Sequence, residues 1–177
     1  MNTLKRIVVI GPESTGKSTL CERLAAHYKT TWVKEYAREY LTKNGTAYSF
    51  ENLRDIATGQ LQLEDAAAAA ISSVNAPLII DTDMYVMKVW CEFVFEKCHH
   101  WILNRIVERQ YDLYLLCNTD LPWVKDELRE YPDLINREKL YHHYKDAMIN
   151  QPVPWVDISG DYDERFEKAT AAINRIL

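Results

Sequence analysis

The stretch RIVVIGPESTGKSTL, residues 6–20, decides the fold. Residues 6–10 form an almost wholly apolar run, which is typical of a strand buried on both faces. Residues 11–18 match the pattern G-x-x-x-x-G-K-[ST], and Leu20 and Leu24 then recur at helical spacing. A strand, a glycine-containing turn and a helix in this order predict a phosphate-binding loop.

The chemistry of such a loop suits a nucleoside triphosphate. Its backbone N–H groups surround phosphate oxygens, and the start of the following helix adds about half a positive charge. Lys17 places a positive charge beside the β- and γ-phosphates, and Ser18 offers its hydroxyl to a magnesium ion. We therefore expect ATP and Mg²⁺ as cofactors, with Lys17 also catalytic. The residues predicted to bind the nucleotide here are Gly11, Glu13, Ser14, Thr15, Gly16, Lys17, Ser18 and Thr19.

Five short apolar runs predict strands, and helical patterns separate them. The runs lie at residues 6–10, 31–33, 78–80, 113–117 and 154–158. Helices are expected over residues 50–74, 85–95, 99–110 and 137–149, and a last one opens with a capping box formed by Asp161 and Glu164. This alternation predicts a three-layer α/β fold with a five-stranded parallel sheet covered on both faces. Ligands bind at the carboxyl ends of such strands.

Composition narrows the class of protein. The 177 residues suffice for one domain over residues 1–177, and a formal net charge of −5 argues against binding to nucleic acid. The four cysteines form no C-x-x-C pair, which favours reduced thiols. No apolar run approaches the roughly 20 residues of a membrane-spanning helix. We expect a cytoplasmic protein with small-molecule partners, without nucleic acid or membrane, and its oligomeric state is unreadable.

Three acidic residues are candidates for the chemistry of phosphate transfer. Asp81 ends an apolar strand, where a carboxylate would hold Mg²⁺. Glu35 follows the second strand and is the candidate base for an acceptor hydroxyl, with Asp83 as the rival. The alternatives are plain: Asp83 would serve equally as a helix N-cap, and Glu35 as part of a charged, solvated helix face.

Other motifs fail or are weak. The N-K-x-D and D-x-x-G motifs of switching nucleotide hydrolases are absent, and so is the dinucleotide-binding G-x-G-x-x-G. The Cys98-His99-His100 run lacks a second pair of ligands at zinc-finger spacing, so we expect no metal there. The phosphate-binding loop thus carries the strongest signal.

Several segments together resemble one family, the ribosylnicotinamide kinase domain of the bacterial NAD-biosynthesis regulator NadR and its stand-alone P-loop relatives. The resemblance covers nearly the whole chain. It rests on GPESTGKS (11–18), EYARE (35–39), DTD (81–83), WVKDELR (123–129) and GDYDERF (160–166). It implies a P-loop nucleoside-kinase-like fold with a small helical lid at approximately residues 119–140. It also implies transfer of the γ-phosphate of ATP to the 5′-hydroxyl of nicotinamide riboside, which gives nicotinamide mononucleotide.

The resemblance also implies roles for single residues. Arg129, and with it Arg137, would lie on the lid and stabilise the transferred phosphoryl group. Gly160 would lie beside the adenine. The residues that would contact the nucleoside are Glu35, Tyr36, Arg38, Asp83 and Trp90. Two alternatives stay open: a P-loop kinase for another nucleoside or nucleotide, and an ATP-sensing module that transfers no phosphate.

Overall fold

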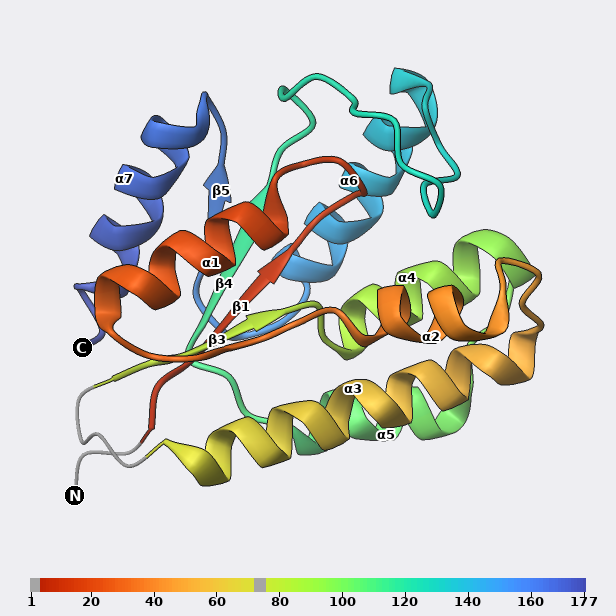
Figure 1. Cartoon of the computed structure of the whole chain (residues 1–177), viewed down its shortest axis with the longest axis horizontal. Coiled ribbons are helices and arrows are strands. Elements are labelled where there is room, and N and C mark those ends of the chain that lie inside the picture. The colour runs from red at the N-terminus through yellow and green to blue at the C-terminus, as the bar shows by residue number, and fades with distance from the viewer. Residues whose placement is uncertain (1–3, 72–75) are drawn as a thin grey trace.

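The computed structural model describes residues 4–71 and 76–177. Its centre is a sheet of five parallel strands in the order β2-β3-β1-β4-β5 (Figure 1). The strands are β1 (Arg6–Ile10), β2 (Trp32–Val33), β3 (Leu78–Asp81), β4 (Leu113–Cys117) and β5 (Trp155–Ile158). These bounds confirm all five predicted strands and the predicted α/β class. These strands could be predicted because central parallel strands are buried on both faces, so that nearly every residue in them is apolar.

The register brings the predicted site residues to one edge of the sheet. In the pairing of β1 with β3, Val9 lies opposite Asp81, and in its pairing with β4, Ile10 lies opposite Leu116. The chain passes from β1 to β2 on one side and reaches β4 on the other, so β1 stands at the point where the strand order reverses. A cleft opens at such a point beyond the carboxyl ends of the strands.

Helices cover both faces of the sheet (Figure 1). Helices α1 (Lys17–Tyr28) and α7 (Tyr162–Ile173) pack on one face through Leu24 and Ile173. Helices α4 (Met84–Phe95) and α6 (Leu134–Ile149) pack on the other through Val89 and Tyr144. The remaining helices are α2 (Tyr36–Asn44), α3 (Phe50–Ala70) and α5 (His100–Glu108). The three-layer prediction is confirmed.

The ends of the helices follow local hydrogen bonding. The predicted capping box at Asp161 and Glu164 is present at the start of α7. Helix α6 begins at Leu134 rather than at the expected Arg137, because the side chain of Asp133 accepts the backbone N–H of Asn136 and caps the helix earlier. Helix α3 ends at Ala70, and the expected extension over 72–74 lies outside the described residues.

A third apolar cluster joins α2, α3, α4 and α5 beside the sheet. At its edge Gly59 of α3 lies against Tyr36 at the start of α2: a Cβ atom on Gly59 would lie 2.0 Å from Cε1 of the tyrosine ring. The missing side chain therefore lets the first turn of α2 approach α3. This packing sets the position of the helix that follows Glu35.

We predict that Gly59→Ala destabilises the protein. Alanine is the better helix former by about 1 kcal/mol, but the clash with Tyr36 adds an overpacking cost of about 1–3 kcal/mol. Urea unfolding should show a net loss of up to about 2 kcal/mol. In a background of Tyr36→Ala the clash is gone, so Gly59→Ala should no longer destabilise the protein relative to Tyr36→Ala alone. A gain in stability for the single variant would contradict the packing described.

Candidate functional site

The phosphate-binding loop has the backbone that its sequence predicts. Gly11 and Gly16 both have positive φ, at 139° and 77°. A Cβ atom on Gly11 would lie 2.7 Å from the carbonyl oxygen of Cys117, and one on Gly16 would lie 2.9 Å from Cδ1 of Leu121. Glycine is favoured at both positions because L-residues rarely adopt such φ values, and at Gly11 the backbone of Cys117 also leaves no space for a side chain. The loop thus lies directly against the end of β4.

Carbonyl groups of the loop have hydrogen-bond donors on its protein side. Arg165 of α7, 2% exposed, donates from Nη1 to the carbonyl oxygen of Thr15 at 2.9 Å. Arg137 of α6, 3% exposed, donates from Nη2 to the carbonyl oxygen of Ser14 at 3.2 Å. Because these carbonyl groups turn into the protein, the loop can present its N–H groups to an anion, as phosphate-binding loops do.

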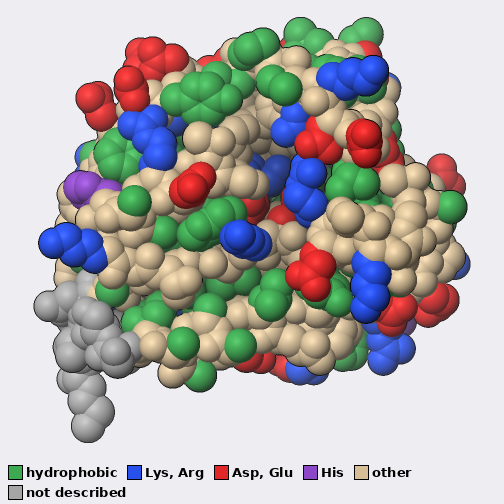
Figure 2. Space-filling model, in the orientation of Figure 1, with side chains coloured by type: hydrophobic (Ala, Val, Ile, Leu, Met, Phe, Trp, Pro, Cys, Tyr) green, Lys and Arg blue, Asp and Glu red, His purple; other side chains and the backbone are tan. Residues whose placement is uncertain are grey.

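A cavity of about 210 Å³ extends from this loop to helix α4. Figure 2 shows it as a hollow near the centre of one face, with basic and acidic side chains around it. One end is formed by the loop residues 11–19, including every residue predicted there to bind the nucleotide. The other end is formed by side chains from α2, α4, α6 and the segment before α6. Both ends therefore belong to one site.

The predicted magnesium ligands lie side by side. The hydroxyl of Ser18 donates to Oδ2 of Asp81 at 2.6 Å, and the Asp81 carboxylate is fully buried. Burial, followed by the charge of Glu35, raises the pKa of Asp81 to about 6. A hydroxyl and a carboxylate are the hard oxygen ligands that Mg²⁺ takes, with water and phosphate as the rest of its shell. The described residues contain no group of three acidic, histidine or cysteine side chains that could hold a metal alone.

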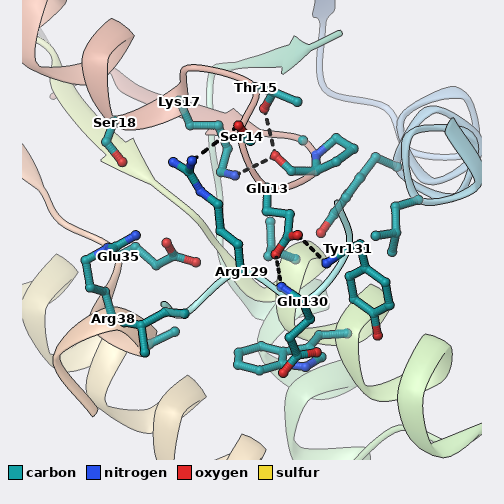
Figure 3. Close-up of a pocket in the computed structure, with 18 of the residues that line it drawn as sticks. Glu13, Ser14, Thr15, Lys17, Ser18, Glu35, Arg38, Arg129, Glu130 and Tyr131 are labelled. Atoms are coloured by element: carbon teal, nitrogen blue, oxygen red, sulfur yellow. Dashed lines mark hydrogen bonds between the residues drawn. The ribbon is translucent and has the colours of Figure 1, made fainter. Parts of the chain in front are cut away.

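Glu35 and Arg38 line the acceptor end of the cavity. Glu35 is the N-cap residue of α2, but its side chain makes no capping hydrogen bond and points into the site (Figure 3). Arg38, one turn along, forms an ion pair with Asp126 at 3.0 Å. Because the charge of Glu35 contributes to the raised pKa of Asp81, the two carboxylates lie close enough to repel each other. That repulsion favours a cation between them.

The wall opposite the loop is aromatic. Trp90 of α4 lines it, and its Nε1 donates to the hydroxyl of Tyr48 at 2.8 Å. Sequence reasoning missed most of this wall, although its α4 members recur at helical spacing. The missed lining residues include Val86, Phe93, Val94, Glu130, Tyr131, Leu140 and Tyr144. Periodicity predicted the helix, but not which stripe of it faces a cavity.

The predicted lid segment crosses the cavity mouth. Between β4 and α6 the chain is irregular and arches past the loop (Figure 1). From this segment Arg129 extends into the cavity, and its Nη1 donates to Oγ of Ser14 at 3.3 Å (Figure 3). Within the predicted lid at 119–140, residues 134–140 form the first part of α6, which packs on the sheet through Leu140.

Three predicted site residues lie elsewhere among the residues that the structure describes. Tyr36 packs against Gly59, and Gly160 lies beside Glu164 at the start of α7. Asp83 is 1% exposed and is the N-cap of α4, with its Oδ1 accepting the N–H of Tyr85 at 2.9 Å. None of the three lines the cavity described above, and neither does Asp81, which contacts the lining residue Ser18. The roles of Asp83, Tyr36 and Gly160 at the site therefore stay predictions, and the contacts described for Asp83 are those of a helix N-cap.

A family model described as an AAA domain matches residues 6–165. This chain belongs to the AAA-domain family. The trifunctional NAD biosynthesis/regulator protein NadR of Escherichia coli (strain K12) is 27% identical to it over 98% of this chain and 43% of NadR. NadR of Salmonella typhimurium (strain LT2) shows the same identity and coverage. This AAA-domain chain thus spans less than half the length of these curated relatives.

Solved structures of NadR share the fold of this AAA domain. NadR in complex with NR superposes with a TM-score of 0.82 and 22% identity, over 97% of this chain and 49% of that one. NadR in complex with NAD and AMP-PNP gives a TM-score of 0.73 and 20% identity over the same shares. Both confirm the architecture predicted from the sequence.

Asp83 has a structural role in this AAA domain that pH should reveal. Burial raises its pKa to about 7, although the hydroxyl of Tyr114 donates to Oδ2 at 2.7 Å. The folded protein therefore holds a proton on Asp83 that the unfolded chain releases near pH 4. Its contribution to stability is complete below pH 4 and is lost as the pH rises through 7.

We predict that Asp83→Asn flattens the pH dependence of stability. In the wild type, the free energy of unfolding should fall by roughly 1.4 kcal/mol per pH unit as the pH rises toward 7, because only the folded protein keeps the proton on Asp83. Asparagine stays neutral and can still accept from the N–H of Tyr85, so the variant should not show this fall. Urea unfolding from pH 5 to 8 should show this difference. The exposed Asp163→Asn is the matched control, and a wild-type slope in Asp83→Asn would refute the raised pKa.

Proposed function

We propose that this domain is a magnesium-dependent kinase that transfers the γ-phosphate of ATP to the 5′-hydroxyl of nicotinamide riboside and so forms nicotinamide mononucleotide. One observation carries the proposal: a single cavity joins the phosphate-binding loop to an acidic and aromatic wall. The names of the NadR relatives and of the NR complex support the same substrate.

The loop end of the cavity suits the triphosphate. The loop N–H groups and Lys17 would hold the β- and γ-phosphates, and a lysine at about 4 Å contributes on the order of 4 kcal/mol at an effective dielectric constant near 20. Ser18 and Asp81 would hold Mg²⁺, which neutralises charge on the phosphates when bound. Arg129 reaches the same region from the lid and would stabilise the phosphoryl group during transfer.

The acceptor end suits a positively charged planar ring on a ribose. Trp90 and Phe93 offer aromatic surface, and Glu35 and Glu130 add negative charge on the same cavity wall. The pyridinium ring of nicotinamide riboside is a cation, which aromatic faces and carboxylates attract. Glu35 would accept the proton of the 5′-hydroxyl as the new phosphate ester forms. Apart from this proton transfer, catalysis of phosphoryl transfer depends mainly on positioning and charge stabilisation.

We also propose that residues 1–177 act as one kinase domain, with its lid at approximately 119–140, and that it works in the cytoplasm. Within the described residues, all four cysteines are free thiols, which suits a reducing compartment. Helices of the described chain are too short or too polar to cross a membrane.

The decisive experiment is a panel of nucleosides incubated with the protein and MgATP. Mass spectrometry of the products should show phosphorylated nicotinamide riboside, with ADP formed in equal amount. Phosphorylation of another nucleoside alone would indicate a related kinase, while tight ATP binding that no nucleoside affects would indicate an ATP sensor. Either result would overturn the proposed substrate.

We predict that Lys17→Ala lowers turnover at least 100-fold while the protein stays folded. The change removes the point charge beside the phosphates, and the remaining loop amides cannot replace it. Steady-state kinetics with nicotinamide riboside and a thermal melt would measure both effects. Lys168→Ala, which changes a surface lysine bonded to Ser159, is the matched control and should keep full activity.

We predict that Glu35→Gln lowers kcat by about 100-fold or more, whereas the KM for ATP stays within about threefold. Glutamine keeps the size of the side chain but cannot take up the proton. Glu39→Gln changes an exposed acid one turn further along α2 and should leave both constants unchanged. Equal turnover in Glu35→Gln would remove this residue as the base.

A further inference from the structure

Glu13 is an unexpected residue in a loop that binds phosphates. Its carboxylate would repel a triphosphate if it pointed into the loop, because two negative charges a few ångströms apart repel in a partly buried site. The structure turns it toward the lid instead (Figure 3). Its Oε2 accepts the backbone N–H of Glu130 at 3.0 Å, and its Oε1 accepts the backbone N–H of Tyr131 at 2.5 Å.

The next loop residue binds the same segment. Oγ of Ser14 accepts the backbone N–H of Val124 at 2.9 Å and a hydrogen bond from Nη1 of Arg129. Two consecutive side chains of the phosphate-binding loop thus hold the main chain of the lid on both sides of Arg129. Hydrogen bonds from backbone N–H groups to a carboxylate are stronger than those between neutral groups, so Glu13 makes the firmer of the two attachments.

The lid is also held from the acceptor wall, at the same residue. The hydroxyl of Tyr48 donates to Oε2 of Glu130 at 3.1 Å and accepts from Nε1 of Trp90 at 2.8 Å. Glu130 therefore has its backbone bound to the nucleotide end of the cavity and its side chain bound to the nucleoside end. Because Glu130 is bound at both the nucleotide end and the nucleoside end of the cavity, a ligand at either end can change the position of the lid.

We propose that Glu13 is a positioning residue of this enzyme: it fastens the lid to the phosphate-binding loop and so holds Arg129 over the site. This role of the side chain is additional to the predicted place of Glu13 in the nucleotide-binding loop, and its kinetic part rests on the proposed kinase function. The backbone N–H of Glu13 stays available to the phosphates as part of the loop. Tyr48 is the corresponding attachment on the nucleoside side.

Hydrogen exchange tests the attachment without any substrate. In Glu13→Gln the side chain has one acceptor oxygen in place of two, and in Glu13→Ala it has none. NMR-detected exchange at the amides of Glu130 and Tyr131 should accelerate at least tenfold in Glu13→Ala and at one of the two amides in Glu13→Gln. Amides of β1 and β4 should not change. Glu22→Gln, an exposed acid on α1, is the matched control.

Kinetics tests the consequence for transfer. Glu13→Gln should lower kcat about tenfold and leave the dissociation constant for ATP within threefold, because the lid and not the nucleotide loses a contact. Tyr48→Phe should mainly raise the KM for the nucleoside. The loss of kcat/KM in the double variant should be smaller than the product of the losses in the two single variants, because both attachments hold Glu130.

The outcomes separate this proposal from the proposed function. Unchanged exchange at both amides in Glu13→Ala would overturn the attachment, whatever the activity. Weaker ATP binding with unchanged exchange would also overturn it and return Glu13 to the nucleotide. Faster exchange in a protein that phosphorylates no nucleoside would support the attachment of the lid while the kinase function fails.

Discussion

The architecture of the site depends on how the carbonyl groups of the phosphate-binding loop are turned. Positive φ angles at Gly11 and Gly16 reverse the chain tightly against the end of β4. Buried guanidinium groups of Arg137 and Arg165 then bind carbonyl oxygens on the protein side. A loop held in this way can keep its N–H groups ready for phosphate before any ligand arrives, so little reorganisation is needed on binding. The two arginines come from α6 and α7, so both faces of the sheet contribute to the shape of one short loop.

Electrostatics completes the site. Asp81 is buried, and burial and the nearby charge of Glu35 raise its pKa, whereas the charge of Lys17 and the hydroxyl of Ser18 lower it. A divalent cation held by Ser18 and Asp81 would lower the cost of ionising Asp81 further. Burial also raises the pKa of Asp83, two residues further, but the hydrogen-bond partners of its carboxyl group are the N–H of Tyr85 and the hydroxyl of Tyr114 and not a residue of the phosphate-binding loop.

The five strands of the sheet and the phosphate-binding end of the site could be predicted from the sequence. The five strands were predictable because each is a short run buried on both faces, a pattern that depends on adjacent residues alone. Loop residues such as Lys17 and Ser18 were predictable because the motif places them at the start of the helix that follows the glycine turn, beside the bound phosphates. Asp81 and Asp83 could not be told apart in this way. Asp81 is the last residue of β3 and Asp83 lies two residues further on, and only the pairing of β3 with β1 and the start of α4 turn one toward Ser18 and the other toward Tyr114.

Local pattern by itself determined the α/β class, the position of the phosphate-binding loop and the identity of its charged residues, because these depend on apolar periodicity and on contacts within a few positions. Tertiary structure decided which distant groups meet. Glu13 reaches the amides of Glu130 and Tyr131 across more than 100 positions, and Arg165 reaches Thr15 across 150. No local propensity encodes such pairs. They form because the parallel sheet brings the carboxyl ends of its strands, and the segments that follow them, to one edge.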